Sequence, residues 1–236
     1  MYGRQARIGY TSPPMVTEVF PREFYNVAPE GVTLGFTTLT VLEVQPDEID
    51  QSLALSLRAA KEMAQAGMNA VVLGGAPVNA SVGIENVDEL MRRTSEECGI
   101  PVTTSLTAQM RSLEAVGARK VALVSPGKGS AVSEHMVREG CEVVDERHAD
   151  YPFIQVGAIP SEVPANLARQ AVRAHPETDT VFFKCAHWAT LDQIQELEDE
   201  LNVNVLSASQ AIIWHAMRLV GVTDSIPGYG RLLAQH

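Results

Sequence analysis

The chain has 236 residues, enough for two small lobes or one larger domain with a substantial buried core. Its 45% hydrophobic and 20% charged residues are typical of a globular protein and exclude a largely disordered chain. The formal net charge of −11 argues against nucleic-acid or anionic-membrane partners, because 29 Asp and Glu residues outnumber 18 Lys and Arg residues. A small-molecule partner is the better expectation.

No apolar run approaches the roughly 20 residues of a membrane span, and the amino terminus lacks the layout of a secretory signal. We therefore expect a cytoplasmic protein with no membrane partner. The three cysteines are widely spaced and odd in number, which indicates reduced thiols rather than a disulfide framework or a zinc site. The six histidines show no close ligand spacing such as HExxH, so we expect neither a metal nor another cofactor.

Strands alternate with helices through the first half of the chain. A short strand at residues 7–10 runs into residues 11–14, where two prolines are expected to end regular pairing. Apolar, β-branched runs predict further strands at residues 32–39, 69–73 and 102–104. Helical periodicity predicts helices at residues 47–66, 86–97 and 106–116.

The second half repeats this plan. Strands are predicted at residues 120–124, 142–145, 181–183 and 203–206, and helices at residues 131–139, 161–174, 190–201 and 210–219. Thr190 followed by Gln193 has the pattern of a capping box that opens a helix. Regular alternation of strands and helices predicts an α/β fold with a mostly parallel sheet.

The two halves also align with each other, and residues 70–77 match residues 180–187 position by position. We therefore predict two pseudosymmetric Rossmann-like lobes, each a mostly parallel sheet flanked by helices, with the active site in the cleft between them. The lobes would span residues 1–117 and 118–236 in one compact unit, and the last helix, 210–220, could pack with the first lobe. Chance similarity between two βαβ units is the alternative.

Cys185 follows a strand that is apolar enough to be buried on both faces, which places its thiol in the crevice beyond the strand's carboxyl end. A thiol with an ordinary pKa of about 8.5 is mostly protonated at neutral pH and can donate a proton. The alternative is a buried packing cysteine. His187, two residues on, could tune this thiol or bind a carboxylate, or it could be a surface residue in a polar loop.

The order and spacing of several motifs resemble the aspartate/glutamate racemase superfamily, and most closely its arylmalonate decarboxylase and maleate isomerase branch. The motifs that carry the resemblance are the strand at residues 8–9 with Pro13 and Pro14, the Gly75 loop, residues 100–104, residues 116–123, the Cys185 strand, residues 218–221 and residues 227–232. The resemblance implies two loops that face a carbon acid from opposite sides. Racemases and isomerases of this group usually carry cysteine in both loops, whereas the decarboxylase retains only the second.

Gly75 stands in the first loop and Cys185 in the second, which is the decarboxylase-like pattern. One thiol can serve only one face of a carbon, which suits a reaction that needs a single proton donor. The resemblance also implies hydroxyl groups that hold the substrate carboxylate, but the matching positions are Ala76, Pro77 and Gly127. Arylmalonate itself is therefore a doubtful substrate.

Other groups would have to bind the carboxylate in place of these hydroxyls. The candidates are the side chains of Asn79, Ser125 and Lys128, and the backbone N–H groups of Gly75, Ala76 and Ala186. Pro14 is expected to line the cleft because it stands at the end of a strand, and Gly127 because of its loop.

Three functions stay open at this point. The first is a cofactor-independent decarboxylase of a small malonate-like acid, in which Cys185 protonates the carbanion. The second is an isomerase or racemase of a small carboxylic acid that uses Cys185 with His187. The third is a catalytically silent protein that binds a small carboxylate. The sequence leaves the substrate and any homo-oligomeric state open.

Overall fold

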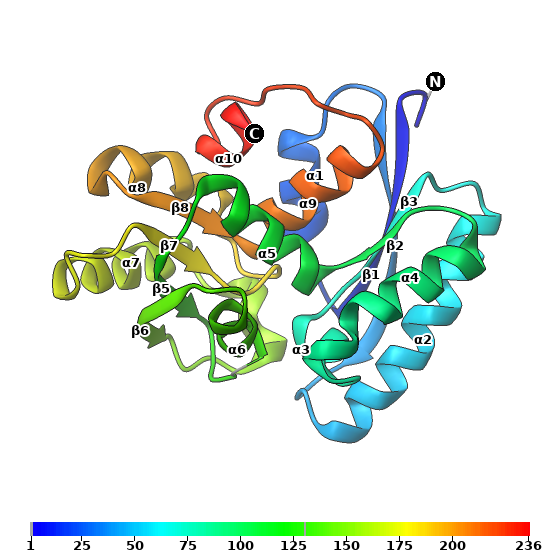
Figure 1. Ribbon diagram of the computed structural model, residues 1–236, viewed down its shortest axis with the longest axis horizontal. Helices are drawn as coiled ribbons and strands as arrows, with labels where there is room; N and C mark the ends of the chain where they lie inside the picture. The colour runs from blue at the N-terminus through cyan, green and yellow to red at the C-terminus, as the bar shows by residue number, and fades with distance from the viewer. Residues whose placement is uncertain (1, 130) are drawn as a thin grey trace.

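The computed structural model describes residues 2–129 and 131–236. Within these residues the chain forms two four-stranded parallel sheets with the same strand order, β2-β1-β3-β4 and β6-β5-β7-β8. The strands of the first sheet are β1 (Ala6–Pro14), β2 (Val32–Val41), β3 (Ala70–Leu73) and β4 (Val102–Thr104). Those of the second are β5 (Lys120–Ser125), β6 (Glu142–His148), β7 (Thr180–Phe183) and β8 (Asn204–Ser207). The repeated order confirms the predicted α/β fold with two pseudosymmetric lobes (Figure 1).

Helices flank each sheet and two of them lie between the lobes (Figure 1). The first sheet is covered by α2 (Pro46–Gln65) and α4 (Val87–Cys98), and the second by α6 (Ala131–Arg138), α7 (Glu162–Ala174) and α8 (Ile194–Leu201). Between the sheets run α5 (Ser105–Val116), which contacts β4 and β8, and α9 (Ala208–Leu219), which contacts β3 and β8. The last long helix therefore packs on both lobes. None of the described helices is both long and apolar enough to span a bilayer.

The strands β3 and β7 are buried along their whole length, as their runs of Val, Leu and Phe predict. Each is one of the two inner strands of its sheet, and each leads into a loop at its carboxyl end. In parallel sheets these ends gather at one edge, so the loops that follow β1, β3, β5 and β7 can meet between the lobes.

The first strand is longer than predicted, because β1 continues through both prolines to Pro14. Its pairing with β3 ends at Thr11, and from there the strand pairs with β2 alone, through a register shift between Ser12 and Pro14. Proline lacks an N–H group and is tolerated where one side of a strand has no neighbour. The strand therefore runs past its predicted end at residue 10, although its regular pairing does break at the prolines.

Short helices escaped the prediction, among them α1 (Val19–Val27), α3 (Ala76–Ala80) and α10 (Arg231–Gln235). The predicted capping box at Thr190 was also wrong, since the Thr190 side chain caps no helix. Instead, the backbone N–H groups of Thr190 and Leu191 donate to the Glu23 carboxylate of α1, at 3.0 and 2.9 Å. A carboxylate from a distant helix thus replaces the local cap.

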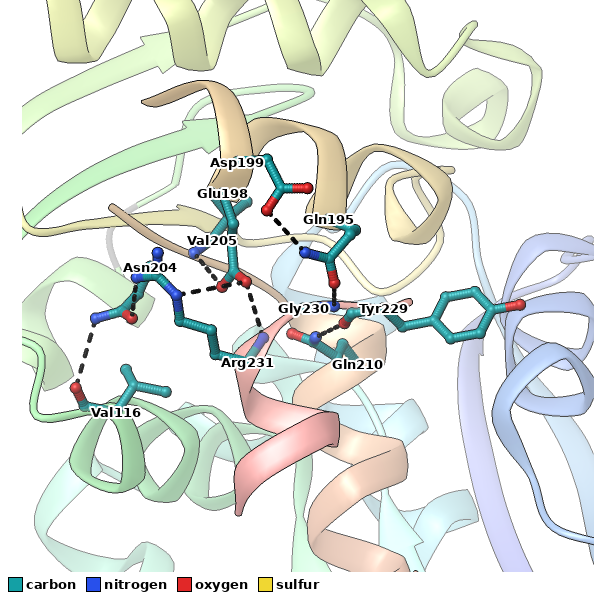
Figure 2. A network of polar contacts seen from close by, with 10 residues as sticks. All are labelled: Val116, Gln195, Glu198, Asp199, Asn204, Val205, Gln210, Tyr229, Gly230 and Arg231. Carbon is teal, nitrogen blue, oxygen red and sulfur yellow. Dashed lines mark hydrogen bonds and ion pairs between the residues drawn. The ribbon is translucent and has the colours of Figure 1, made fainter. Parts of the chain in front are cut away.

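The carboxyl-terminal tail is held against the second lobe by several polar contacts, as Figure 2 shows. Glu198 of α8 accepts hydrogen bonds from the backbone N–H groups of Arg231, at 2.8 Å, and Val205, at 3.1 Å. Gln210 of α9 donates to the carbonyl of Tyr229 at 2.6 Å. The turn-rich tail is therefore part of the packed structure.

Candidate active site

The strand ends of both lobes border one cavity of about 840 Å³. Its wall is formed by residues of β1 and β2, by the segments that follow β2, β3, β5, β6 and β7, and by residues of α5 and α9. A smaller hollow of about 400 Å³ lies between α4, α5 and α6 and includes no strand-end loop. The larger cavity is the candidate site, because ligands of open α/β sheets bind beyond the carboxyl ends of the strands.

Of the described cysteines, only Cys185 lines this cavity. Its side chain is half-buried in the loop after β7, and burial raises the pKa of the thiol to about 11. The nearby backbone N–H groups of His187 and Trp188 oppose this rise in the pKa. The thiol is therefore protonated at neutral pH, and these N–H groups favour the thiolate that remains after it gives up its proton.

Gly75 lies on the same cavity in the loop after β3, at the position equivalent to Cys185. Its φ of 85° belongs to the left-handed region, which favours glycine. A Cβ atom at this position would lie 2.4 Å from Cγ of Pro13. The close approach of Pro13 therefore requires a residue without a side chain here, and the first lobe presents no thiol to the cavity.

His187 also lines the cavity, although its side chain is only 5% exposed. Its Nδ1 shares a hydrogen bond of 2.8 Å with Oγ1 of Thr17, in the loop before α1. Burial lowers the pKa of the imidazole to about 3, so the ring is neutral at ordinary pH. The sequence did not indicate Thr17, because the contact joins residues 170 positions apart.

The structure brings most of the predicted binding residues to the cavity: Gly75, Ala76, Ser125, Gly127, Lys128 and Ala186 all line it. Ser125 has no proton left for a substrate, because its hydroxyl donates to the carbonyl of Gly127 at 2.7 Å. The same oxygen lies 2.7 Å from Nδ1 of His148, which can donate to it. Ser125 therefore organises its loop and is not a replacement hydrogen-bond donor.

Two of the predicted binding residues are absent from the cavity wall. Pro13, and not Pro14, lines the cavity, because the bulged strand turns the second proline toward β2. Asn79 is fully buried in α3, where its Oδ1 accepts from Oγ of Ser105 at 2.8 Å and from the N–H of Leu106 at 3.3 Å. It therefore ties α3 to the start of α5 behind the wall.

Several cavity residues lie outside the predicted set of site residues. Tyr10 of β1 lines the cavity, stacks on Phe20 with ring centroids 4.0 Å apart, and has a buried hydroxyl with no hydrogen-bond partner among the described residues. Burial, together with the nearby Cys185, raises the pKa of this phenol. Lys184 lines the cavity and donates to the carbonyl of Gly129. An aromatic residue just before a strand end was the only sequence signal for Tyr10.

Across residues 2–129 and 131–236, His, Cys, Asp and Glu side chains form no group of three that could hold a metal ion. The polar groups at the cavity include the thiol of Cys185, the neutral imidazole of His187, the phenol of Tyr10 and two lysines, with backbone N–H groups in the loops. This set can bind a carboxylate and move one proton.

Comparison with known proteins agrees with this geometry. A sequence model of the family described as arylmalonate decarboxylase matches residues 8–233. The arylmalonate decarboxylase of Bordetella bronchiseptica is 29% identical over 198 residues, which cover 80% of this chain and 81% of that protein. A maleate isomerase of Alcaligenes faecalis is 26% identical over 216 residues, which cover 87% of this chain and 84% of that protein. A crystal structure of arylmalonate decarboxylase superimposes with a TM-score of 0.84 at 27% identity, over 96% of this chain and 98% of that one.

These matches confirm the branch of the superfamily that the sequence motifs indicated. The relatives are enzymes, which supports an enzyme here, a decarboxylase or an isomerase at the level of the family. The family match spans nearly the whole chain and both lobes of the fold, so the protein belongs to the arylmalonate decarboxylase family.

Proposed function

We propose that this protein is a cofactor-independent decarboxylase of a small malonate-like acid, in which Cys185 protonates the carbanion. The observation that carries the proposal is the asymmetry of the cavity. Cys185 lines it from the second lobe, while the equivalent residue of the first lobe is Gly75. A single proton donor on one face suits the loss of CO₂ followed by one protonation, and would give one enantiomer of the product.

The proposed reaction has two steps. The bond between the α-carbon and one carboxylate breaks, CO₂ leaves, and the electron pair stays on the α-carbon as an enediolate with the remaining carboxylate. The S–H bond of Cys185 then breaks as its proton moves to that carbon. The thiolate, which the nearby N–H groups of His187 and Trp188 favour, then regains a proton from water.

Backbone N–H groups are the proposed donors for the carboxylate that becomes the enediolate. Gly75, Ala76 and Ala186 all border the cavity and belong to the two loops that face each other. Fixed backbone donors suit this role, because they stabilise developing negative charge without having to reorganise. Lys128 is exposed at the rim, where its charge can attract an acid into the cavity.

Apolar side chains occupy much of the remaining wall, including Val41, Val44, Ile49, Phe153 and Ile212. A carboxylate held against such a surface is destabilised, because it loses the water that solvates its charge. CO₂ carries no charge and is not destabilised in this way. The apolar wall therefore favours the step in which CO₂ forms.

An isomerase that pairs Cys185 with His187 is the competing proposal, and the buried imidazole argues against it. A ring with a pKa of about 3 is a weak base at neutral pH, and its Nδ1 is already bonded to Thr17. Such a ring is better suited to donate a hydrogen bond than to exchange protons with carbon.

The test is turnover of substituted malonates, measured as released CO₂, in water and in D₂O. We expect one solvent deuterium at the α-carbon, a single product enantiomer, and a loss of about 10²–10⁴-fold in kcat for Cys185→Ala. Cys141→Ala is the matched control, because Cys141 lies outside the cavity and bonds to the carbonyl of Ala118. Full activity of Cys185→Ala would falsify the proposal, and deuterium exchange into acids without CO₂ release would favour the isomerase.

A further inference from the structure

The side chain of one glutamine on the cavity wall makes no hydrogen bond within the part of the chain that the structure describes. Gln109 of α5 lines the cavity, is only 2% exposed, and makes no side-chain hydrogen bond to another described residue. Its Oε1 is fully buried and unpaired. Burying an amide without partners is unfavourable, so such groups in folded proteins are nearly always satisfied by something.

The fold itself does not require a polar residue at this position. Gln109 stands five residues after Thr104, the residue that caps α5, and Ile212 stands five residues after Ser207, the residue that caps α9. The two helices are therefore equivalent, and Ile212 lines the same cavity from the other lobe. One lobe presents an amide where its counterpart presents a hydrocarbon, which points to a role for the amide in ligand recognition.

A second acceptor lies one helical turn from Gln109. Ser105 also lines the cavity, and its hydroxyl proton is donated to Oδ1 of Asn79 at 2.8 Å. Its oxygen can therefore offer only lone pairs to a ligand. Residues four apart on a helix are neighbours on one face, so Oγ of Ser105 and the amide of Gln109 lie side by side and both are uncharged. The Ser105 oxygen can only accept a hydrogen bond, whereas the amide can accept or donate one.

We propose that Gln109 recognises a neutral hydrogen-bond donor, a hydroxyl or carboxamide, on the α-substituent of the substrate. The amide can turn about its last bond so that either its oxygen or its nitrogen faces the ligand, and a hydroxyl can donate to the oxygen or accept from the nitrogen. A second carboxylate in this place would only accept hydrogen bonds and would meet the lone pairs of Ser105. An alkyl or aryl substituent would leave the amide unpaired. The malonate core of the substrate rests on the proposed function, whereas the recognition by Gln109 does not.

The test uses two acids of nearly the same shape, hydroxymethylmalonate and ethylmalonate. Their binding is measured by calorimetry in a Cys185→Ala background, so that no turnover occurs. We expect hydroxymethylmalonate to bind about tenfold more tightly, the effect of one buried hydrogen bond whose loss leaves an amide unpaired. Gln109→Leu should abolish this preference, while Ile212→Leu, the equivalent change in the other lobe, should keep it.

Three results would overturn the inference. They are equal binding of the two acids, a preference that survives in Gln109→Leu, and the absence of binding by either acid. The melting temperature of Gln109→Leu is a further check, because removing an unpaired amide should leave it equal or raise it. A clear fall would show that the amide has a partner within the protein, and would also count against the inference.

Release of CO₂ by the unaltered protein separates this inference from the proposed function. A binding preference without CO₂ from either acid would refute the decarboxylase and leave the role of Gln109 standing. Release of CO₂ from both acids with no preference in binding would refute the role of Gln109 alone.

Discussion

The thiol of Cys185 sets the pH range in which the proposed reaction can run. A proton donor works only while it holds its proton, and burial raises the pKa of this thiol to about 11, above the ordinary value of about 8.5. We therefore predict that the alkaline limb of kcat/KM has its midpoint near pH 11, with little change between neutral pH and pH 10. The pH profile with a malonate substrate measures this directly.

Thiolate absorbance in a variant that lacks Cys98 and Cys141 is the independent check, because Cys185 is then the only thiol. The same variant with Cys185→Ala is subtracted, which removes the absorbance of the five titrating tyrosines. A midpoint near pH 8.5 in both measurements would show that the thiol is not buried as described. The same midpoint in Cys185→Ala would show that another group causes the limb.

Single residues also show how far the candidate site could be predicted. Cys185 and His187 follow a recognisable buried strand, so their place at the cavity could be read from the local sequence. Gln109 could not be found in this way, because a polar residue in an amphipathic helix normally indicates the solvent side. Only the packing of α5 against α9 turns that position toward the cavity.

At the scale of elements, the strands and long helices were predictable because their apolar periodicity is local. The short helices α1 and α3 were not, since each is held mainly by the lobes around it. The backbone N–H groups of Thr190 and Leu191 could not be assigned a partner from the local sequence either. Their acceptor is Glu23, 167 residues before Thr190. Thr190 has the sequence of a cap, but a buried carboxylate takes its place.

The tail offers a prediction at this scale. In Figure 2 the Glu198 carboxylate faces the backbone N–H groups of Val205 and Arg231, and its side chain is buried. Replacing it in Glu198→Leu leaves both donors without an acceptor, and we expect a loss of about 2–4 kcal/mol in the free energy of unfolding. Urea unfolding measures the loss, and faster amide exchange at Arg231 would locate it in the tail.

Glu196→Leu on the same helix is the matched control. Glu196 pairs with Arg169 on the surface, where its side chain is 67% exposed, so little change is expected. Equal stability of the two variants would mean that the tail is not held by Glu198.

For the whole molecule, the chemistry arises where the two lobes depart from their symmetry. The strand orders are the same, and both interlobe helices begin at a hydroxyl cap. Yet Gly75 corresponds to Cys185, Pro77 to His187, and Gln109 to Ile212, and all of these residues line one cavity. A symmetric scaffold thus presents different groups to the two faces of a ligand.

Glu23 connects the parts of this scaffold and carries the last prediction. From α1 its buried carboxylate accepts from Thr190 and Leu191, which follow the Cys185 loop, and from the hydroxyl of Ser209 on α9. Glu23→Ala would leave two buried N–H groups unpaired, so we expect a loss of about 2–5 kcal/mol in the free energy of unfolding and a fall in kcat as the loop loosens. Urea unfolding followed by the fluorescence of Trp188 and Trp214 measures the first effect.

Glu23→Gln separates the role of the acceptor from that of the charge. Its amide oxygen can still accept from both N–H groups, and its amide nitrogen can donate to Ser209 Oγ, so most of the stability should return. Glu30→Ala controls for the loss of a carboxylate at the surface, where its ion pair with Arg4 contributes little. If Glu23→Ala unfolds at the same urea concentration as Glu30→Ala, then the lobes are held together by their apolar contacts alone, and the Cys185 loop does not depend on α1.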